Sequence, residues 1–170
     1  MPKTDQGSIS QTDRYTVIPR VLVFVTHGDD VLLIKGAPDK RLWANRYNGL
    51  GGHVEPGEEI AHAARREVRE EAGLEVQDLR MRGVVHVDLS PAPGILFFVY
   101  SARSETRETR PSPEGSLHWL PLDALTGYDL VEDVPVLLEH LAHGDPAGSP
   151  FTARYHYDAE DRLQIEFASP

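Results

Sequence analysis

The first strong pattern along the chain is an apolar run that begins after Thr16. Between residues 17 and 25 nearly every position is apolar, which is typical of a buried strand. Pro19 lies near the start of this run, where a missing backbone donor is tolerated. Residues 27–30 have the composition of a turn, and residues 31–34 are again apolar. The pattern therefore predicts a β-hairpin over residues 17–34.

An apolar stripe at helical spacing marks residues 58–72. Ile60, Ala64 and Val68 recur every four residues, so they fall on one side of a helix. Acidic residues open the segment, where the helix dipole favours negative charge. Gly73 follows in the position of a helix C-cap. We therefore expect a helix over residues 58–72.

The rest of the chain alternates between short strand-like and helix-like segments. We expect strands at about residues 75–79, 82–89, 94–102 and 117–120, short helices at 121–125 and 134–141, and a terminal hairpin from 155–157 and 163–167. This mixture is typical of an α/β domain in which a mixed sheet lies between helices. Residues 1–14 are polar and are expected to form a flexible tail. Residues 15–170 would then form one domain, a length sufficient for a full hydrophobic core.

The charge balance limits the partners that the chain can have. Against 17 Lys and Arg stand 27 Asp and Glu, which gives a net charge of −10 at pH 7. Attraction to phosphates drives non-specific nucleic-acid binding, so we expect no nucleic-acid partner and, by the same reasoning, no anionic membrane. An anionic substrate would need a local source of positive charge, and a divalent cation is the obvious candidate.

The absence of cysteine excludes several kinds of chemistry. The chain has no cysteine, and therefore no disulfide scaffold, cysteine nucleophile, iron–sulfur cluster or thiolate zinc site. No apolar run approaches the roughly 20 residues that a membrane-spanning helix needs. Residues 1–14 contain no hydrophobic signal core. We therefore expect a cytoplasmic protein.

Three carboxylates share one face of the predicted helix. Glu67, Glu70 and Glu71 stand at positions i, i+3 and i+4, about one turn apart. Like charges at this spacing repel one another by roughly 0.2–0.5 kcal/mol per pair, and a bound cation would remove that repulsion. Clustered carboxylates suit Mg²⁺ or Mn²⁺. The alternative is an ordinary solvated stripe, neutralised by neighbouring arginines such as Arg65 and Arg69.

The surrounding segment strengthens the metal-site interpretation. Gly52 is followed after five residues by Glu58, after seven more by Arg66-Glu67-Val68, and then by Glu70-Glu71 and Gly73-Leu74. This spacing over residues 52–74 resembles the complete signature of the Nudix hydrolases. The resemblance implies a Nudix-type α/β/α sandwich with a mixed β-sheet, and hydrolysis of a nucleoside diphosphate linked to another moiety.

The same resemblance assigns roles to individual residues. It implies that Glu67, Glu70 and Glu71, aided by the Gly51 carbonyl, hold the divalent ion. Arg66 would lock the catalytic helix by pairing with a glutamate such as Glu58. Magnesium would polarise the phosphoryl oxygens and acidify a bound water.

One glutamate near that water can act as general base. We expect Glu70 or Glu67 in this role. Some members of the family use a glutamate on a later loop, and Glu114 is the matching candidate here. An ordinary exposed loop acid is the alternative interpretation of Glu114.

The layout outside the signature is similar to the oxidised-purine nucleotide branch of the family. That similarity implies that Asn48, Glu132 and Asp133 read the base, since an amide and carboxylates offer donors and acceptors to a purine edge. Local rules offer another interpretation. Asn48 can be a turn residue, and the acidic pair can cap the helix that begins near Val134.

The aromatic residue that stacks on the base in that branch is replaced here by Leu130. Stacking would then fall to Tyr47, Trp43, Phe24 or another aromatic side chain. Trp43 is the more informative candidate, because a tryptophan in a polar loop is rarely kept without packing or a ligand. The similarity thus favours a (d)NTP such as 8-oxo-dGTP, cleaved to NMP and pyrophosphate.

Other functions remain open at this point. An ADP-ribose, nucleotide-sugar or dinucleoside polyphosphate pyrophosphatase is the enzymatic alternative. A nucleotide-binding sensor without turnover is the alternative of another class. In each case we expect a small-molecule nucleotide as ligand and a monomer or homodimer as the assembly.

Overall fold

The predicted N-terminal hairpin is present in the computed structural model, which describes residues 14–40, 42–143 and 148–168. Strand β1 (Val17–His27) pairs antiparallel with β2 (Asp30–Gly36), so that Val25 lies opposite Leu32. Gly28 in the connecting turn has a φ of 59°, a conformation that glycine adopts without steric cost. Residues 1–13 of the predicted tail lie outside the described residues.

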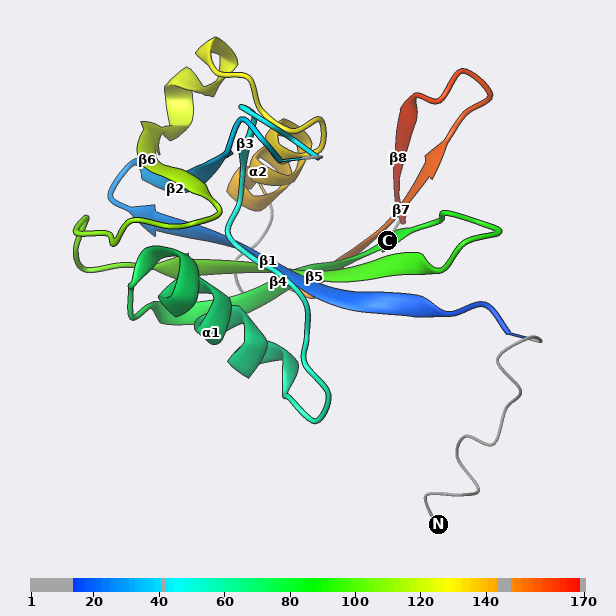
Figure 1. Cartoon of the computed structure of the whole chain (residues 1–170), viewed down its shortest axis with the longest axis horizontal. Coiled ribbons are helices and arrows are strands. Elements are labelled where there is room, and N and C mark those ends of the chain that lie inside the picture. Colours follow the sequence, from blue (N-terminus) through cyan, green and yellow to red (C-terminus); the bar gives the residue numbers. More distant parts are fainter. Residues whose placement is uncertain (1–13, 41, 144–147, 169–170) are drawn as a thin grey trace.

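All named strands of the described residues belong to one mixed sheet (Figure 1). Besides β1 and β2, it contains β3 (Tyr47–Asn48), β4 (Gln77–Val87), β5 (Gly94–Arg103), β6 (Gly115–Pro121), β7 (Phe151–Tyr157) and β8 (Leu163–Phe167). The strand order is β3-β2-β1-β5-β4-β7-β8, with β6 paired to β2. Strands β1 and β5 run parallel, as do β4 and β7, whereas the other pairs are antiparallel.

Strand β4 corrects the sequence prediction, which placed two strands at 75–79 and 82–89. One strand runs from Gln77 to Val87 and pairs with β5 along its length. Its register shifts between Met81 and Gly83. A bulge of this kind absorbs an extra residue while pairing continues, so the gap between the predicted strands is an irregularity within one strand.

Helix α1 (Ile60–Ala72) begins two residues later than predicted. Its N-cap is Glu59, whose side chain accepts a hydrogen bond from the His62 backbone N–H at 3.0 Å. The acidic residues expected in the first turn therefore precede the helix. The C-cap is confirmed: Gly73 is left-handed with a φ of 72°, and its N–H donates to the Arg69 carbonyl.

The downstream elements follow the predicted order. The helix expected at 121–125 is a 3-10 helix, η2 (Leu122–Gly127), and α2 (Val134–His143) extends slightly beyond the expected 134–141. The terminal hairpin is formed by β7 and β8, with β7 starting at Phe151. None of the helices in the described residues is long and apolar enough to cross a membrane.

Side chains of β1 alternate between two separate cores. Val21, Val23 and Val25 pack in the core that includes α1, whereas Leu22 and Phe24 pack in the core that includes α2. The two helices therefore cover opposite faces of the sheet, as Figure 1 shows. The predicted α/β/α sandwich with a mixed sheet is confirmed. The β7–β8 hairpin projects beyond the helices and leaves part of the sheet uncovered (Figure 1).

Candidate active site

A glycine-rich loop, residues 49–52, runs antiparallel beside β1. The Val21 N–H donates to the Gly52 carbonyl at 2.9 Å, and Val23 and Leu50 exchange backbone hydrogen bonds. Gly51 has a φ of 152°, and a Cβ there would collide with the Val21 carbonyl oxygen. Only glycine allows the loop to lie this close to the strand.

Helix α1 presses its glutamates against this loop. A Cβ on Gly52 would lie within about 2.5 Å of Glu67 Oε1, so the missing side chain is the space that the Glu67 carboxylate occupies. One turn further, Glu71 Oε2 accepts a hydrogen bond from the Gly51 N–H at 2.9 Å. Two carboxylates of the helix thus converge on two consecutive glycines.

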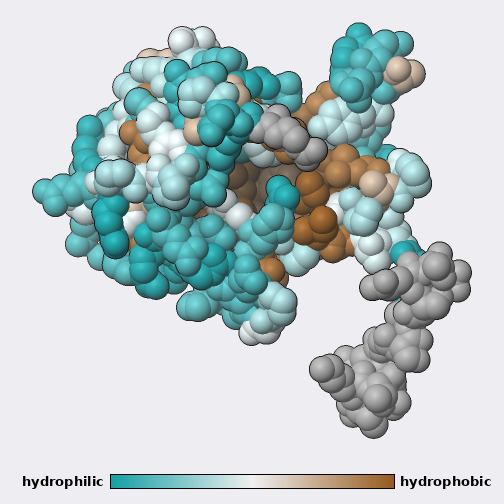
Figure 2. Space-filling model, in the orientation of Figure 1, coloured by the Kyte–Doolittle hydropathy of each residue, from teal (hydrophilic) through white to brown (hydrophobic). Residues whose placement is uncertain are grey.

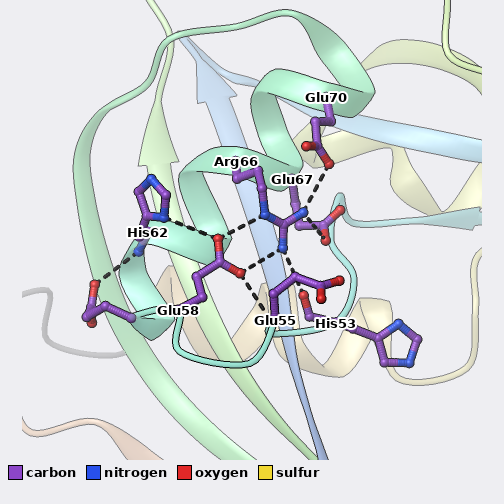
Figure 3. A network of polar contacts seen from close by, with 8 residues as sticks. His53, Glu55, Glu58, His62, Arg66, Glu67 and Glu70 are labelled. Atoms are coloured by element: carbon purple, nitrogen blue, oxygen red, sulfur yellow. Dashed lines mark hydrogen bonds and ion pairs between the residues drawn. The ribbon is translucent and has the colours of Figure 1, made fainter.

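Arg66, in the middle of α1, is the centre of an ion-pair network that reaches the loop before the helix (Figure 3). Its Nε and Nη2 donate to the two oxygens of Glu58, each at 2.9 Å, which confirms the predicted pairing. Its Nη1 donates to Glu67 Oε1 at 2.9 Å and to Glu70 Oε2 at 3.0 Å. Its Nη2 also donates to the His53 carbonyl. One guanidinium therefore ties the helix to the loop before it.

Each carboxylate of the cluster has a different electrostatic environment. The hydrogen bonds from Arg66 lower the pKa of Glu58 to about 2. Burial raises the pKa of Glu67, and burial raises the pKa of Glu71 to about 8 despite its hydrogen bond from Gly51. Glu70 is 60% exposed and points along the helix surface toward Arg66. The positive charge present at Glu67 and Glu71 is therefore insufficient to offset their desolvation.

These residues fit a hard divalent cation in their chemistry. The carboxylates and the Gly51 carbonyl are oxygen donors of the kind that Mg²⁺ and Mn²⁺ prefer. In the arrangement described, Glu67 and Glu70 point to Arg66 and Glu71 points to the Gly51 N–H. No group of three His, Cys, Asp or Glu within the described residues has the arrangement that would hold a metal ion. Side-chain rotation is needed before these oxygens could share one ion.

Glu114 lies close to this cluster. It precedes β6, and its carboxylate forms an ion pair with Lys40. Its negative charge is near enough to contribute to the raised pKa of Glu71. Glu114 therefore lies near Glu71, the most buried glutamate of the cluster, and is paired with Lys40.

A cleft of about 470 Å³ opens beside the loop, on the α2 side of the sheet. Figure 2 shows apolar surface gathered in this hollow, next to the projecting β7–β8 hairpin. Four of the predicted substrate-binding residues line it together: Trp43, Asn48, Glu132 and Asp133. Gly51 and Gly52 line its edge toward the glutamates.

Tyr47, the fifth predicted substrate residue, does not line the cleft. It is buried, and its ring packs edge-on against His118 and Tyr128. Its backbone has a different role, because its N–H donates to the Asp129 carbonyl and its carbonyl accepts from Val131. Tyr47 thereby holds the segment before α2 next to Asn48.

Asn48 presents only part of its amide to the cleft. Its Oδ1 accepts a hydrogen bond from the Gly49 N–H at 2.8 Å. The side-chain NH₂ group keeps its donors for other partners. Asn48 is therefore both the turn residue that local rules suggest and a donor that faces the cleft.

The two acids beside Asn48 differ in availability. Glu132 is bound to Arg46 Nη1 at 3.1 Å and is largely exposed. Asp133 has no side-chain ion pair within the described residues, and burial raises its pKa to about 6. The negative charge of Asp133 is thus less compensated by a positive partner than that of Glu132.

Trp43 has a strained backbone and a partly exposed ring. Its φ is 58°, which is unusual for a bulky residue, and it is 43% exposed while lining the cleft. Such strain persists only where the surrounding structure enforces it, and it clusters at functional sites. Phe24, another stacking candidate, is buried in the core and does not line the cleft.

The cleft also contains residues that the sequence reasoning missed. They include Arg20 on β1, Phe97 on β5 and Tyr155 on β7. A lone arginine within the apolar run at 17–25 was a usable signal for Arg20. Tyr155 gave no comparable signal, because its place in the cleft depends on the pairing of β7 with β4.

Comparisons with known proteins agree with this fold. A family model described as "NUDIX domain" matches residues 16–141. The chain is 33% identical over 111 residues to the protein named "NAD-capped RNA hydrolase NudC" of Pseudomonas syringae pv. syringae (strain B728a), which covers 64% of this chain and 38% of that protein. It is 33% identical over 129 residues to "Oxidized purine nucleoside triphosphate hydrolase" of Mus musculus, which covers 69% of this chain and 78% of that one.

A solved structure from Bacillus halodurans, titled as a mutator MutT protein, has the same fold. The TM-score is 0.75 with 22% sequence identity, and the match covers 91% of this chain and 100% of that chain. At this identity the likeness concerns the fold alone. The chain spans well under half the length of the NudC relative, whereas it spans most of the mouse protein.

Proposed function

This chain belongs to the NUDIX domain family, and from that premise we propose that it hydrolyses a nucleoside diphosphate linked to another moiety. Within that class we propose a (d)NTP such as 8-oxo-dGTP as the substrate, with NMP and pyrophosphate as the products. The observation that carries the proposal is the cleft, because it joins Trp43, Asn48 and Asp133 to the same two glycines that α1 lines with carboxylates.

Nudix hydrolases generally use divalent metal ions, and we propose Mg²⁺ or Mn²⁺ here. The Gly51 carbonyl, Glu67, Glu70 and Glu71 would hold it. The ion would supply charge neutralisation to the diphosphate and acidify water. Arg66 would keep its two hydrogen bonds to Glu58 while Glu67 and Glu70 turn away from its Nη1.

The reaction is the attack of water on a phosphorus atom of the anhydride. The water oxygen forms a new bond to phosphorus, the anhydride P–O bond breaks, and the leaving phosphate takes the electron pair. A carboxylate accepts the water proton. Glu70 or Glu67 is proposed as that base, with Glu114 as the alternative, since its carboxylate lies near the same cluster.

Recognition of the base would use the cleft. The Trp43 ring offers a stacking surface, the Asn48 NH₂ offers donors, and Asp133 offers acceptors. Glu132 would act through Arg46, which holds it at the rim of the cleft. Tyr47 would support Asn48 through its backbone rather than contact the base.

A second candidate substrate is a dinucleotide-type diphosphate, such as NAD or ADP-ribose. Several relatives are named as NAD-capped RNA hydrolases, so the expectation that nucleic acid is not a partner stays a prediction. The apolar part of the cleft, which includes Leu89, Ile95 and Phe97, could accept a second ring system. A dinucleoside polyphosphate or nucleotide sugar belongs to the same group.

The test is a product assay. The protein is incubated with Mg²⁺ or Mn²⁺ and dGTP, 8-oxo-dGTP, the other dNTPs, NAD, ADP-ribose or a diadenosine polyphosphate, and the products are separated by chromatography. NMP and pyrophosphate from triphosphates support the first proposal. AMP with NMN from NAD, or with ribose 5-phosphate from ADP-ribose, supports the second. Binding of these compounds without turnover would leave the nucleotide sensor as the better interpretation.

A further inference from the structure

Two buried polar atoms in the cleft lack hydrogen-bond partners. Among the described residues, buried side-chain atoms without a partner are Arg20 Nε, Arg46 Nε, Tyr155 Oη and His156 Nδ1. Arg20 and Tyr155 both line the cleft, while Arg46 and His156 do not. Buried polar groups are almost always paired, and each orphan carries a desolvation cost. A ligand in the cleft would supply both missing partners.

Tyr155 is anchored firmly on the floor of the cleft. It is 2% exposed, and its ring packs edge-on against Phe97 with a centroid separation of 5.8 Å. Burial raises the pKa of the Tyr155 hydroxyl, and the nearby negative charge of Asp133 adds to this, yet no hydrogen bond joins the two side chains. Both groups therefore retain hydrogen-bonding capacity at the end of the cleft nearest α2.

Arg20 lies at the other end, beside the glycine loop. Its backbone bridges to His53, and its neighbour Val21 binds Gly52. The remaining charged residues in the cleft lining are Glu132 and Asp133, so Arg20 is the one cation among the described residues that line it. Its Nε–H is a donor suited to a phosphate oxygen.

The sheet register measures the separation of the two orphans. Arg20 pairs with Phe97, Phe97 with Val85, and Val85 with Ala153, which lies two residues before Tyr155. Three strand spacings of about 4.8 Å and two residues along the strand place the two backbones roughly 15 Å apart. A ligand with two separated polar ends suits this spacing of the two backbones.

We propose that the Tyr155 hydroxyl and the Arg20 Nε–H are substrate contacts that set the direction of the bound nucleotide. The base lies over Tyr155 beside Asp133, and the phosphates extend past Arg20 toward Gly51 and Gly52. This assignment rests on the proposed function and names two binding residues for it. Tyr155 acts on the choice of base, whereas Arg20 acts on the anionic chain whatever the base.

The first test is thermal unfolding without ligand. Tyr155→Phe removes only the orphan hydroxyl, so we expect a melting temperature equal to or above that of the wild type. Tyr128→Phe is the matched control, because the Tyr128 ring packs on Tyr47 and does not line the cleft. A melting temperature several degrees below the wild type for Tyr155→Phe would mean that the hydroxyl has a structural partner, and would overturn the proposal.

The second test crosses the two variants with the substrate panel. Tyr155→Phe should lower kcat/KM roughly 5- to 100-fold for the preferred base and much less for other bases, since one hydrogen bond to the base is lost. Arg20→Gln should lower kcat/KM by a similar factor for every base. Arg20→Lys keeps the charge and should recover part of the loss if Arg20→Gln folds poorly. Arg103→Gln, which breaks a surface ion pair with Asp78, is the matched arginine control.

Binding measured without turnover separates the assignment of Tyr155 and Arg20 as substrate contacts from the proposed hydrolysis. In buffer with a chelator, 8-oxo-dGMP and inorganic pyrophosphate are titrated separately while the melting temperature is followed. Tyr155→Phe should lose the melting-temperature shift caused by 8-oxo-dGMP and keep the shift caused by pyrophosphate. Arg20→Gln should lose the shift caused by pyrophosphate. Equal shifts in the wild type and both variants would overturn the assignment. A wild type that binds these compounds but hydrolyses nothing contradicts only the proposed hydrolysis, whereas one that binds none contradicts both.

Discussion

The α1 and α2 faces of the sheet differ in how their polar side chains find hydrogen-bond partners. On the α1 face, one contiguous segment supplies the charged groups, and Arg66 gives hydrogen bonds to three carboxylates. On the α2 face, the cleft collects residues from distant strands and leaves Arg20 Nε and Tyr155 Oη without partners. Among the described residues, the first region has no buried side-chain atom without a hydrogen-bond partner, and the second has two. We infer that the α1 face is arranged for chemistry and the cleft for selection.

The largest expected effect comes from removing a charge on the α1 face. Glu67→Gln and Glu70→Gln should each lower kcat by about 10³-fold, because each removes a carboxylate proposed to hold the ion, and loss of a proton acceptor by itself costs 10²–10⁴-fold. Circular dichroism should show a retained fold. Glu75→Gln is the matched control, since Glu75 pairs with Arg69 at the surface away from the cleft. Full activity in both site variants would contradict the inference that the α1 face is arranged for chemistry.

Arg66→Lys tests whether the α1 face depends on one guanidinium. Lysine cannot donate two parallel hydrogen bonds to Glu58, so we expect a melting temperature lower by several degrees and reduced activity. Arg66 lowers the pKa of Glu58 from 4.5 to about 2, so the stability from this pair is present above pH 4.5 and is lost as the pH falls toward 2. The variant and wild type should therefore converge in stability at the acid end of a pH series.

Trp43→Ala tests the cleft without touching the α1 face. Loss of a stacking surface should raise KM roughly 10-fold, with kcat changed little. Steady-state kinetics on the preferred substrate measures both constants. Trp119→Ala makes a poor control because Trp119 packs on the core, so Leu122→Ala on the exposed 3-10 helix is the better comparison. A fall in kcat alone would place Trp43 with the chemistry instead.

Asp133→Asn should give the smallest effect, and it concerns stability. The folded-state pKa of Asp133 is raised from 3.8 to about 6, so its charged form costs stability that is absent below pH 3.8 and fully present above pH 6. The variant should match the wild type at pH 3.8 and melt a few degrees higher at pH 7. Thermal unfolding across this range measures the difference, and a constant difference at all pH values would contradict it.

The sequence predicted the α1 face better than the cleft for a physical reason. Helix periodicity and fixed spacing place Glu67, Glu70 and Glu71 relative to one another without knowledge of the rest of the fold. Asn48 and Asp133 could be placed in the cleft only through resemblance. Tyr155 reaches it through strand pairing between distant segments, which no local pattern encodes. Tyr47 shows the converse error, because its side chain is buried in the core beneath the α2 face, against His118 and Tyr128, and does not reach the cleft next to Asn48.

The loop beside β1 also fixes the distance between Asn48 and Gly51. Asn48 and Gly51 have two residues between them, and the three steps of extended chain, held to β1 at Leu50, have a fixed length of roughly 10 Å. If the base is bound at Asn48 and the ion at Gly51, this fixed distance determines which phosphoanhydride bond lies at the ion and is cleaved. The group attached beyond that bond does not affect the position of cleavage. Substrates with quite different leaving groups would then be cut at the same position, and a one-residue deletion between Asn48 and Gly51 would move the cut or abolish it.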